Sequence, residues 1–223
     1  MYKTVVFDLD GTLLNTLTDL ADAGNRLCRK YGWPTHERQA YRYFVGNGIP
    51  KLVERLAPAD QRTPAVLEAA LADFKRDYGQ HLRDTTAPYP GIPEMLAKLK
   101  ANGVQLAVFS NKADALAKEV VKDYFGTQYF TIVRGQMTGV APKPAAEGTN
   151  ALLQALHADP ASTLYVGDSN VDVETARNAG VDCAAVCWGF RTEDELRAAG
   201  ATALFHTPGE LGDYILGASA EKR

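Results

Sequence analysis

The sequence contains few cysteines and histidines, and neither type forms a recognisable site. Cys28, Cys183 and Cys187 are the only three cysteines in 223 residues, and they make no CxxC pair. The four histidines are scattered and make no HExxH pattern. A disulfide framework and a zinc site of the Cys/His type are therefore not indicated, and we expect reduced thiols.

The chain also lacks long apolar runs and an excess of one charge. No segment approaches the length that crosses a bilayer, and the N-terminus has no signal-like pattern. The formal net charge is −3, without the basic stripe and interleaved aromatics of a nucleic-acid-binding surface. We expect a cytoplasmic protein, a monomer or homodimer, that binds a small molecule but no nucleic acid and no membrane.

Short apolar runs alternate with helical patterns in the C-terminal part of the chain. The composition, with 46% hydrophobic and 23% charged residues, is that of an ordinary globular protein. Expected strands are 4–8, 104–110, 129–133, 163–168, 182–188 and 203–205. Expected helices are 91–103, 113–126, 145–157, 170–180, 192–200 and 208–216. This alternation predicts an α/β fold with a doubly wound, mostly parallel, Rossmann-like sheet, which binds ligands at the carboxyl ends of its strands.

The segment between the first strand and Tyr89 has a different pattern. This region shows no convincing strand. Its expected helices are 16–32, 36–44, 49–57 and 64–84. The stretch TTAPYPG that follows contains two prolines and a glycine and reads as a hinge or linker. We therefore predict a core domain of residues 1–14 and 88–223 with an inserted α-helical cap domain of residues 15–87.

Two carboxylates, Asp8 and Asp10, follow the first apolar run in the sequence FDLDGT. Gly11 would let the backbone turn sharply there, so that both carboxylates face the ligand crevice. Two anions so close together need a cation, and Mg²⁺ prefers carboxylate and carbonyl oxygens. The alternative is a simple turn that ends the strand, because Asp-Gly is also common turn chemistry.

Three further polar groups each come after an expected strand. Ser110 and Asn111 could hold a phosphate or cap a helix. Lys143, between two prolines, offers a fixed point charge to an anion or is merely a loop lysine. Asp168 could complete an acidic metal site, with Asp172 nearby, or Asp168 or Ser169 could cap the following helix.

The four motifs together resemble those of the haloacid dehalogenase superfamily of phosphohydrolases. They are DLDGT at 8–12, Ser110 with Asn111, Lys143, and GDSNVD at 167–172. The resemblance covers essentially the whole chain, including a helical cap inserted after the first strand. It implies a hydrolase of small phosphorylated substrates that uses Mg²⁺ and forms an aspartyl-phosphate.

The resemblance also implies a role for each matching residue. Asp8 would be the nucleophile, and Asp10 the general acid and base. Mg²⁺ would be held by the carboxylates of Asp8 and Asp168 and by the carbonyl oxygen of Asp10, with Asp172 orienting the site. The phosphoryl oxygens would be received by Ser110, Asn111 and Lys143.

The cap segment FVGNGIPKLVERLAP, residues 44–58, resembles the substrate loop of phosphoglycolate phosphatases. The backbone of Gly46, Asn47 and Gly48 could face a small carboxylate, and Lys51 or Arg55 could supply positive charge. The glycines could instead merely link two cap helices. The stretch WGFRTEDEL at 188–196 also resembles the core of this family.

Two departures from the family pattern leave the subfamily open. Asn15 and Thr16 stand where many relatives have Asp and Ser, and KPAA replaces the frequent KPxP. Pyrophosphatases, sugar phosphatases and β-phosphoglucomutases share all four motifs, so they remain alternatives. The dehalogenase branch lacks an equivalent of Asp10, and a phosphonate-cleaving relative would need a Schiff-base lysine in the cap. Outside the enzymes, a non-catalytic binding protein can have the same fold.

Overall fold

A parallel six-stranded sheet forms the centre of the molecule. The computed structural model describes residues 1–217, so the end of the predicted core range lies outside the described residues. The strands are β1 (Thr4–Phe7), β4 (Gln105–Ala113), β5 (Phe130–Gln136), β6 (Thr163–Gly167), β7 (Asp182–Val186) and β8 (Ala203–Phe205). Their order is β5-β4-β1-β6-β7-β8, and every neighbouring pair is parallel. The predicted α/β fold with a doubly wound parallel sheet is confirmed.

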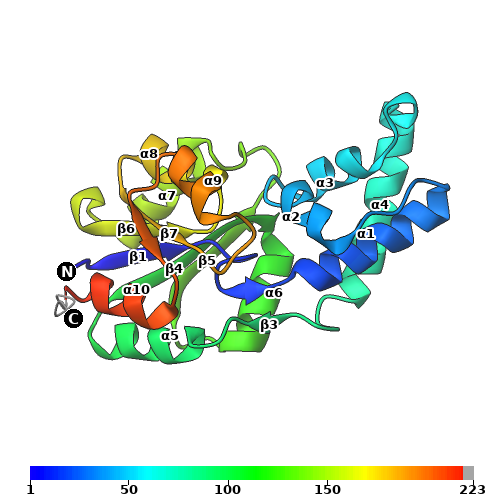
Figure 1. Ribbon diagram of the computed structural model, residues 1–223. Coiled ribbons are helices and arrows are strands. Elements are labelled where there is room, and N and C mark those ends of the chain that lie inside the picture. The colour runs from blue at the N-terminus through cyan, green and yellow to red at the C-terminus, as the bar shows by residue number, and fades with distance from the viewer. Residues whose placement is uncertain (218–223) are drawn as a thin grey trace.

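Helices cover both faces of this sheet (Figure 1). They are α5 (Ile92–Ala101), α6 (Asp114–Phe125), α7 (Ala146–Leu156), α8 (Asn170–Ala179), α9 (Glu193–Ala198) and α10 (Pro208–Ile215). Val5 and Phe7 of β1 pack into the cluster that contains α5, α6 and α10, whereas Val6 packs toward α7 and α8. Both faces of the central strands are thus buried, which explains their continuous apolar sequences.

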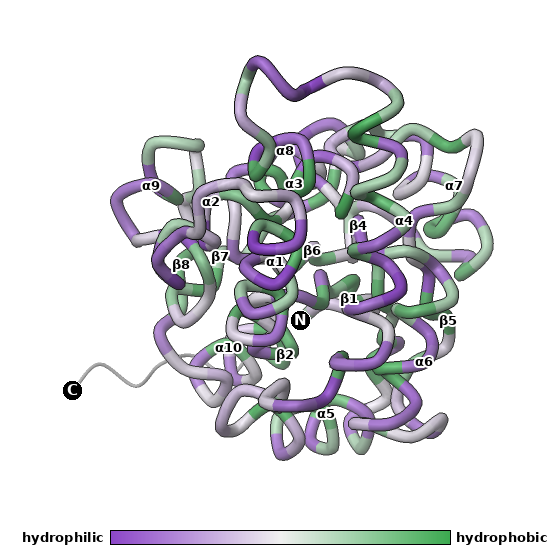
Figure 2. The backbone as a smooth tube through the Cα atoms, turned by 90° about the vertical axis from the view of Figure 1, so that its right-hand side faces the viewer, coloured by the Kyte–Doolittle hydropathy of each residue, from purple (hydrophilic) through white to green (hydrophobic). Residues whose placement is uncertain are grey.

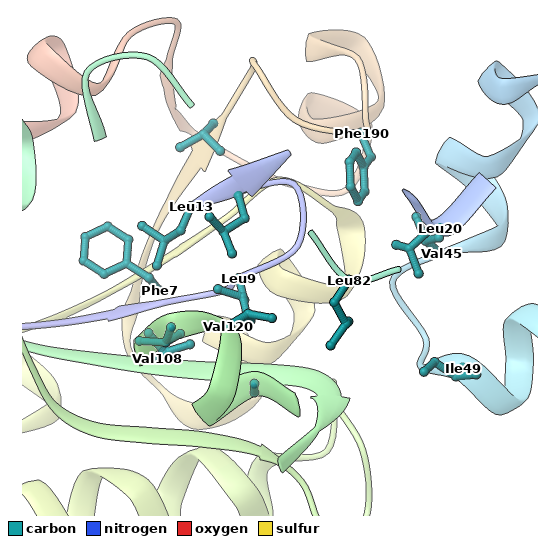
Figure 3. Packing of buried hydrophobic residues seen from close by; sticks show 14 of the residues in the cluster. Phe7, Leu9, Leu13, Leu20, Val45, Ile49, Leu82, Val108, Val120 and Phe190 are labelled. Atoms are coloured by element: carbon teal, nitrogen blue, oxygen red, sulfur yellow. The ribbon is translucent and has the colours of Figure 1, made fainter. Parts of the chain in front are cut away.

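Four more helices lie beyond the carboxyl ends of the strands (Figure 1). They are α1 (Leu17–Tyr31), α2 (Tyr41–Phe44), α3 (Ile49–Leu56) and α4 (Pro64–Gln80). Figure 2 views the molecule from their side, and polar and apolar positions alternate along them. The buried apolar cluster of the sheet continues into these helices through Leu20, Val45 and Ile49 (Figure 3). Their apolar faces therefore pack on one another and toward the sheet. Among residues 1–217, no helix combines the length and apolar character needed to cross a membrane.

The expectation of no strand before Tyr89 was wrong, because a short antiparallel ribbon joins the two parts. It pairs β2 (Leu14–Asn15) with β3 (Ala87–Pro88), which lies inside the predicted linker. Strands of two residues carry no readable periodicity; they form because the outgoing and returning chains run side by side. The predicted domain boundaries fall in this ribbon, and the division into core and cap domains stays a prediction.

The buried carboxylate of Asp19 ties this ribbon to the start of α1. It accepts hydrogen bonds from the backbone N–H of Thr85 and Thr86 at 2.9 Å each. It also accepts from their hydroxyl groups, at 2.5 and 2.7 Å. Hydrogen bonds to a charged acceptor are stronger than those between neutral groups. Asp19 therefore fixes the chain segment that leaves the sheet to the segment that returns to it.

Candidate active site

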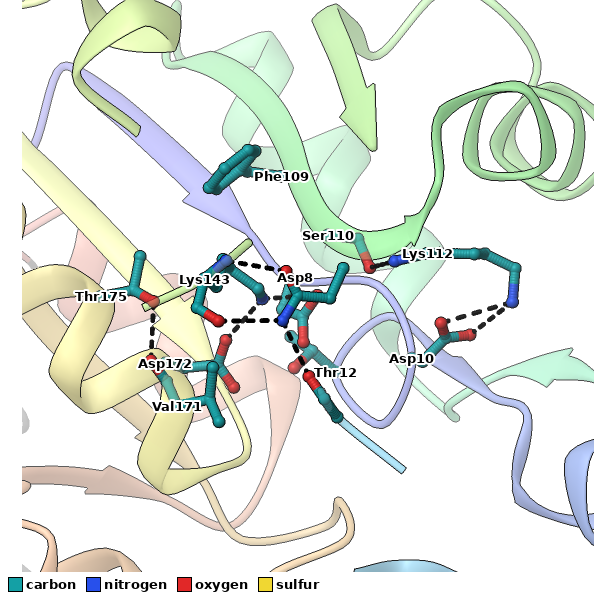
Figure 4. A network of polar contacts seen from close by, with 12 residues as sticks. Asp8, Asp10, Thr12, Phe109, Ser110, Lys112, Lys143, Val171, Asp172 and Thr175 are labelled. Carbon is teal, nitrogen blue, oxygen red and sulfur yellow. Dashed lines mark hydrogen bonds and ion pairs between the residues drawn. The ribbon is translucent and has the colours of Figure 1, made fainter. Parts of the chain in front are cut away.

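The loop after β1 directs two aspartates to different sides. Asp8 continues the line of β1, and its N–H donates to the carbonyl of Val166 at 2.8 Å. The chain then turns at Gly11, which has a φ of 90°. A Cβ at Gly11 would lie 2.4 Å from Asp168 Oδ2, so both the turn and this close approach require glycine. Asp8 consequently faces the middle of the sheet edge, and Asp10 faces away from it (Figure 4).

Lys143 is the buried cation at the centre of the site (Figure 4). Its Nζ lies 3.0 Å from Asp8 Oδ1, 2.8 Å from Asp172 Oδ1 and 3.1 Å from the hydroxyl of Tyr165. Burial by itself lowers the pKa of Lys143, but the carboxylates of Asp172 and Asp8 raise it well above the ordinary value. Lys143 is therefore held as an ammonium ion that pairs with two carboxylates.

Three buried carboxylates surround this one lysine. Asp8, Asp168 and Asp172 each offer an oxygen, and these atoms all lie within 4.8 Å of one another. Burial raises the pKa of Asp8, against the effect of Lys143, and burial followed by the charges of Asp172 and Asp8 raises that of Asp168. The site thus has more negative than positive charge and favours an additional cation.

The donor atoms fit a hard divalent cation. All three groups are carboxylates, and apart from its ion pair with Lys143, Asp8 Oδ1 is buried without a hydrogen-bond donor among the described residues. Asp168 is oriented by the hydroxyl of Thr12 at 2.9 Å and by the N–H of Phe190 at 2.7 Å. Oxygen-only ligands of this kind suit a divalent metal ion, which Asp8 and Asp168 would hold.

Asp172 is already occupied by protein contacts. Its Oδ1 accepts from Lys143, and its Oδ2 accepts from the N–H and hydroxyl of Ser169 at 3.1 and 2.6 Å. The contacts to Ser169 form the capping box that begins α8. Asp172 thereby links Lys143 to the start of a helix, as an orienting residue does.

Ser110 and Asn111 lie within β4 and not at its end. The expected strand end at residue 110 was wrong, because β4 continues to Ala113 after a register shift that follows Phe109. The side-chain amide of Asn111 donates to the carbonyls of Gly46 and Lys143, and its oxygen accepts the N–H of Lys143 at 2.8 Å. The irregular strand thus brings both polar residues beside Asp8 and joins the Lys143 loop to the helical part.

Asp10 has a lysine of its own, which the sequence analysis missed. Lys112 Nζ lies 3.0 and 3.3 Å from the two carboxylate oxygens of Asp10 and 2.9 Å from the hydroxyl of Tyr78. The side chain of Lys112 is only 2% exposed. A charged residue directly after Ser110 and Asn111, in an otherwise apolar strand, is the signal that could have revealed it.

A pocket lies between the sheet edge and the helices. From the sheet side it is lined by Asp8, Asp10, Ser110, Asn111 and Lys112. From the helical side it is lined by Leu20, Val45, Gly46, Gly48, Ile49, Leu52 and Tyr78. The structure thus places Asp8 and Asp10, the polar residues of β4 and two of the predicted loop glycines around one space.

The other predicted cap residues lie elsewhere. Lys51 pairs with Glu54 at 2.8 Å and, with Asn47, lines a different groove. Arg55 donates to the carbonyls of Tyr43 and Phe44 and to Asn47 Oδ1, so it braces the loop. The structure does not bring Lys51 or Arg55 to the pocket, and their contact with substrate stays a prediction. Among the described residues, Lys112 is the lysine that lines the pocket.

Comparison with known proteins shows which family the chain resembles. The family model of the haloacid dehalogenase-like hydrolases matches residues 5–186. A phosphoglycolate phosphatase of Chromobacterium violaceum is 34% identical over 86% of this chain and 87% of its own. The phosphoglycolate phosphatase of Thiobacillus denitrificans is 32% identical over 84% of both chains.

A solved structure has the same fold over nearly its whole length. It is a protein of Lactobacillus delbrueckii subsp. bulgaricus, provisionally named a phosphoglycolate phosphatase. It superposes with a TM-score of 0.91 and 31% identity, covering 97% of this chain and 99% of the other. The helical part is included in this coverage, so the likeness is not limited to the sheet.

Proposed function

Since the chain belongs to the haloacid dehalogenase-like hydrolase family and is a phosphatase, we propose that it hydrolyses 2-phosphoglycolate with Mg²⁺. One observation carries the catalytic part of this proposal: Asp8 Oδ1 is buried at the pocket, is paired with Lys143 Nζ at 3.0 Å, and accepts no hydrogen bond from any other described residue. A carboxylate oxygen that is held at the pocket by one cation and by no other hydrogen-bond donor is placed to attack phosphorus.

The proposed reaction has two steps, both on Asp8. Its carboxylate attacks phosphorus in line and the ester bond breaks, while Asp10 gives its proton to the departing alkoxide. A water molecule then gives a proton to Asp10 and attacks the aspartyl-phosphate, which restores Asp8 and releases orthophosphate. The separation of the two aspartates by one residue puts nucleophile and proton carrier on different sides of the phosphoryl group.

The other polar groups hold the phosphoryl oxygens. We assign this task to the ammonium of Lys143 and the hydroxyl of Ser110, because positive charge and donors stabilise the charge that develops there. Asn111, whose side-chain amide donates to the carbonyls of Gly46 and Lys143, would contribute by holding the Lys143 loop beside the phosphoryl group. Mg²⁺, held by Asp8, Asp168 and the Asp10 carbonyl, would neutralise the repulsion between Asp8 and the substrate dianion. Asp172 orients Lys143 through their 2.8 Å contact.

The choice of phosphoglycolate rests on the curated relatives and on the pocket. The relatives cover the helical part as well as the sheet, and this part lines one side of the pocket. The pocket wall contributed by Leu20, Val45, Ile49 and Leu52 is apolar and offers few hydrogen-bond partners to the hydroxyl groups of a sugar. The carboxylate of glycolate would instead face the backbone of Gly46 and Gly48, which line the same pocket.

A substrate panel tests this assignment. We expect kcat/KM for 2-phosphoglycolate to exceed that for pyrophosphate, β-glucose 1-phosphate and glucose 6-phosphate by at least about a hundredfold. The measurement is orthophosphate release by the purified protein with Mg²⁺. A similar, low rate with every compound would count against phosphoglycolate, and a preference for pyrophosphate or β-glucose 1-phosphate would replace it with one of those substrates.

Metal binding should stabilise the protein more at high pH than at low pH. The pKa values of Asp8 and Asp168 are raised in the folded protein, so the metal-free fold binds protons that the unfolded chain releases. Its free energy of unfolding should therefore fall as the pH rises from about 5 to about 8. Mg²⁺ competes with those protons, and its stabilisation should grow over the same interval.

Thermal unfolding in EDTA and in excess MgCl2, at both ends of this pH interval, measures the effect. Asp168→Asn supplies the control, because it removes one of the carboxylates and should remove most of the Mg²⁺-dependent shift. An equal shift at both pH values would contradict the role of these buried carboxylates.

A further inference from the structure

We propose that Lys112 and Tyr78 are positioning residues that hold the carboxylate of Asp10 against the leaving-group side of the pocket. This inference rests on the proposed function, in which Asp10 transfers the proton. It adds that the residue reaching in from helix α4 helps to place the acid and base.

Each of the two aspartates after β1 has a separate buried lysine (Figure 4). Lys143 contacts Asp8 at 3.0 Å, and Lys112 contacts both oxygens of Asp10 at 3.0 and 3.3 Å. No residue contacts both aspartates in this way among the hydrogen bonds and ion pairs of the described residues. The two lysines therefore serve two different carboxylates, and Lys112 acts on the one that moves the proton.

Lys112 is held rigidly enough to fix that carboxylate. It lies on β4, its side chain is 2% exposed, and its Nζ also donates to the hydroxyl of Tyr78 at 2.9 Å. The same Nζ lies 4.9 Å from the centre of the Tyr78 ring. The side chain of Asp10 remains 20% exposed, and Asp10 lines the pocket. Its open side therefore faces the space where the leaving group must lie.

Tyr78 makes this arrangement depend on the helical part. It is fully buried near the end of α4, whereas Lys112 and Asp10 belong to the sheet edge. The hydroxyl can reach Lys112 only while α4 stands over the pocket. The position of the helices and the position of the proton-transferring carboxylate are thus connected through one hydrogen bond, which is how a lid can complete a catalytic site.

The leaving group provides a readout that a merely structural role would not change. An alkoxide such as glycolate needs a proton as it leaves, whereas 4-nitrophenolate leaves without one. Hydrolysis of the aspartyl-phosphate needs Asp10 as a base for either substrate. Misplacing Asp10 should therefore slow the first step for alkyl phosphates and only the second step for 4-nitrophenyl phosphate.

Lys112→Met removes the cation at nearly unchanged volume. In single-turnover experiments we expect cleavage of 2-phosphoglycolate to slow by about a hundredfold and cleavage of 4-nitrophenyl phosphate by less than about fivefold. With the second substrate the variant should release a burst of about one 4-nitrophenolate per site before a slow steady state. Inhibition by orthophosphate should stay within about threefold of the parent, because other residues bind the phosphoryl group.

Tyr78→Phe gives the same test without removing a charge, should Lys112→Met fail to fold. It removes one hydroxyl, and we expect the same selective slowing for the alkyl phosphate, by about fivefold to tenfold. Tyr31→Phe is the matched control, because it loses a hydroxyl contact to Asp73 within the helices, away from the pocket.

The outcomes are distinguishable. Equal slowing with both substrates, or a rise in KM alone, would overturn the positioning role of Lys112 and Tyr78 in favour of a structural or a substrate-binding one. A parent protein that hydrolyses neither phosphate ester would instead refute the proposed function, before any variant is made.

Discussion

Asp8→Asn should abolish turnover, with a loss of at least about 10⁵-fold in kcat, while the protein remains folded. The amide cannot attack phosphorus, and the remaining groups can only bind the substrate. The substitution keeps the shape of the side chain and removes one of three crowded carboxylates. Since burial raises the pKa of Asp8, the neutral amide should leave the metal-free protein at least as stable as the parent at neutral pH.

Orthophosphate release and thermal unfolding in EDTA measure the two halves of this expectation. Asp60→Asn is the matched control, because Asp60 is exposed in the 3-10 helix Ala59–Gln61 and does not line the pocket. Turnover above about one per cent of the parent in Asp8→Asn would show that another group attacks phosphorus. A loss of stability would contradict the crowding of negative charge inferred for the site.

Lys143→Met should have the second large effect, on both stability and activity. The substitution leaves Asp8 and Asp172 buried without their shared cation, and breaking a buried pair on one side costs about 3–5 kcal/mol of unfolding free energy. For a chain of this size, that loss lowers the melting temperature by roughly 10 °C. Turnover should fall at least about a thousandfold, because the ammonium also faces the phosphoryl oxygens.

The stability loss in Lys143→Met should be smaller at about pH 5 than at about pH 8, because the uncompensated carboxylates then take up protons. Adding Asp172→Asn to Lys143→Met should recover part of the stability but not the activity. Lys118→Met, which removes an exposed lysine paired with Asp114, is the control. A single variant as stable as the parent at both pH values would contradict the proposed charge balance.

The apolar strands and the DLDGT motif were readable because they are local. A strand covered on both faces needs consecutive apolar residues, so β1 and β6 can be recognised from a few consecutive residues of the sequence. The predicted motif residues follow from the same logic, since the carboxyl ends of parallel strands meet at one edge. The two-residue strands β2 and β3 escaped prediction because pairing over so short a length leaves no periodic pattern.

The contacts around Asp10 could not be predicted from local sequence patterns. Tyr78 and Lys112 are 34 positions apart, and each looks like an ordinary helix or strand residue on its own. The direction of Lys51 was equally undetermined, because a flexible lysine on α3 can point to the pocket or to Glu54, and it points to Glu54. Arg55 donates to the backbone carbonyl of Phe44, and the sequence does not show which carbonyls a side chain will reach.

The sequence by itself determined the sheet, the order of its strands along the chain and the four polar motifs, since each depends on neighbours within a few residues. Only the tertiary structure decided which cation serves which aspartate, which cap residues line the pocket and how the ribbon is tied to Asp19. These contacts join residues from different elements, and their distances depend on how whole helices pack against the sheet and not on any local preference.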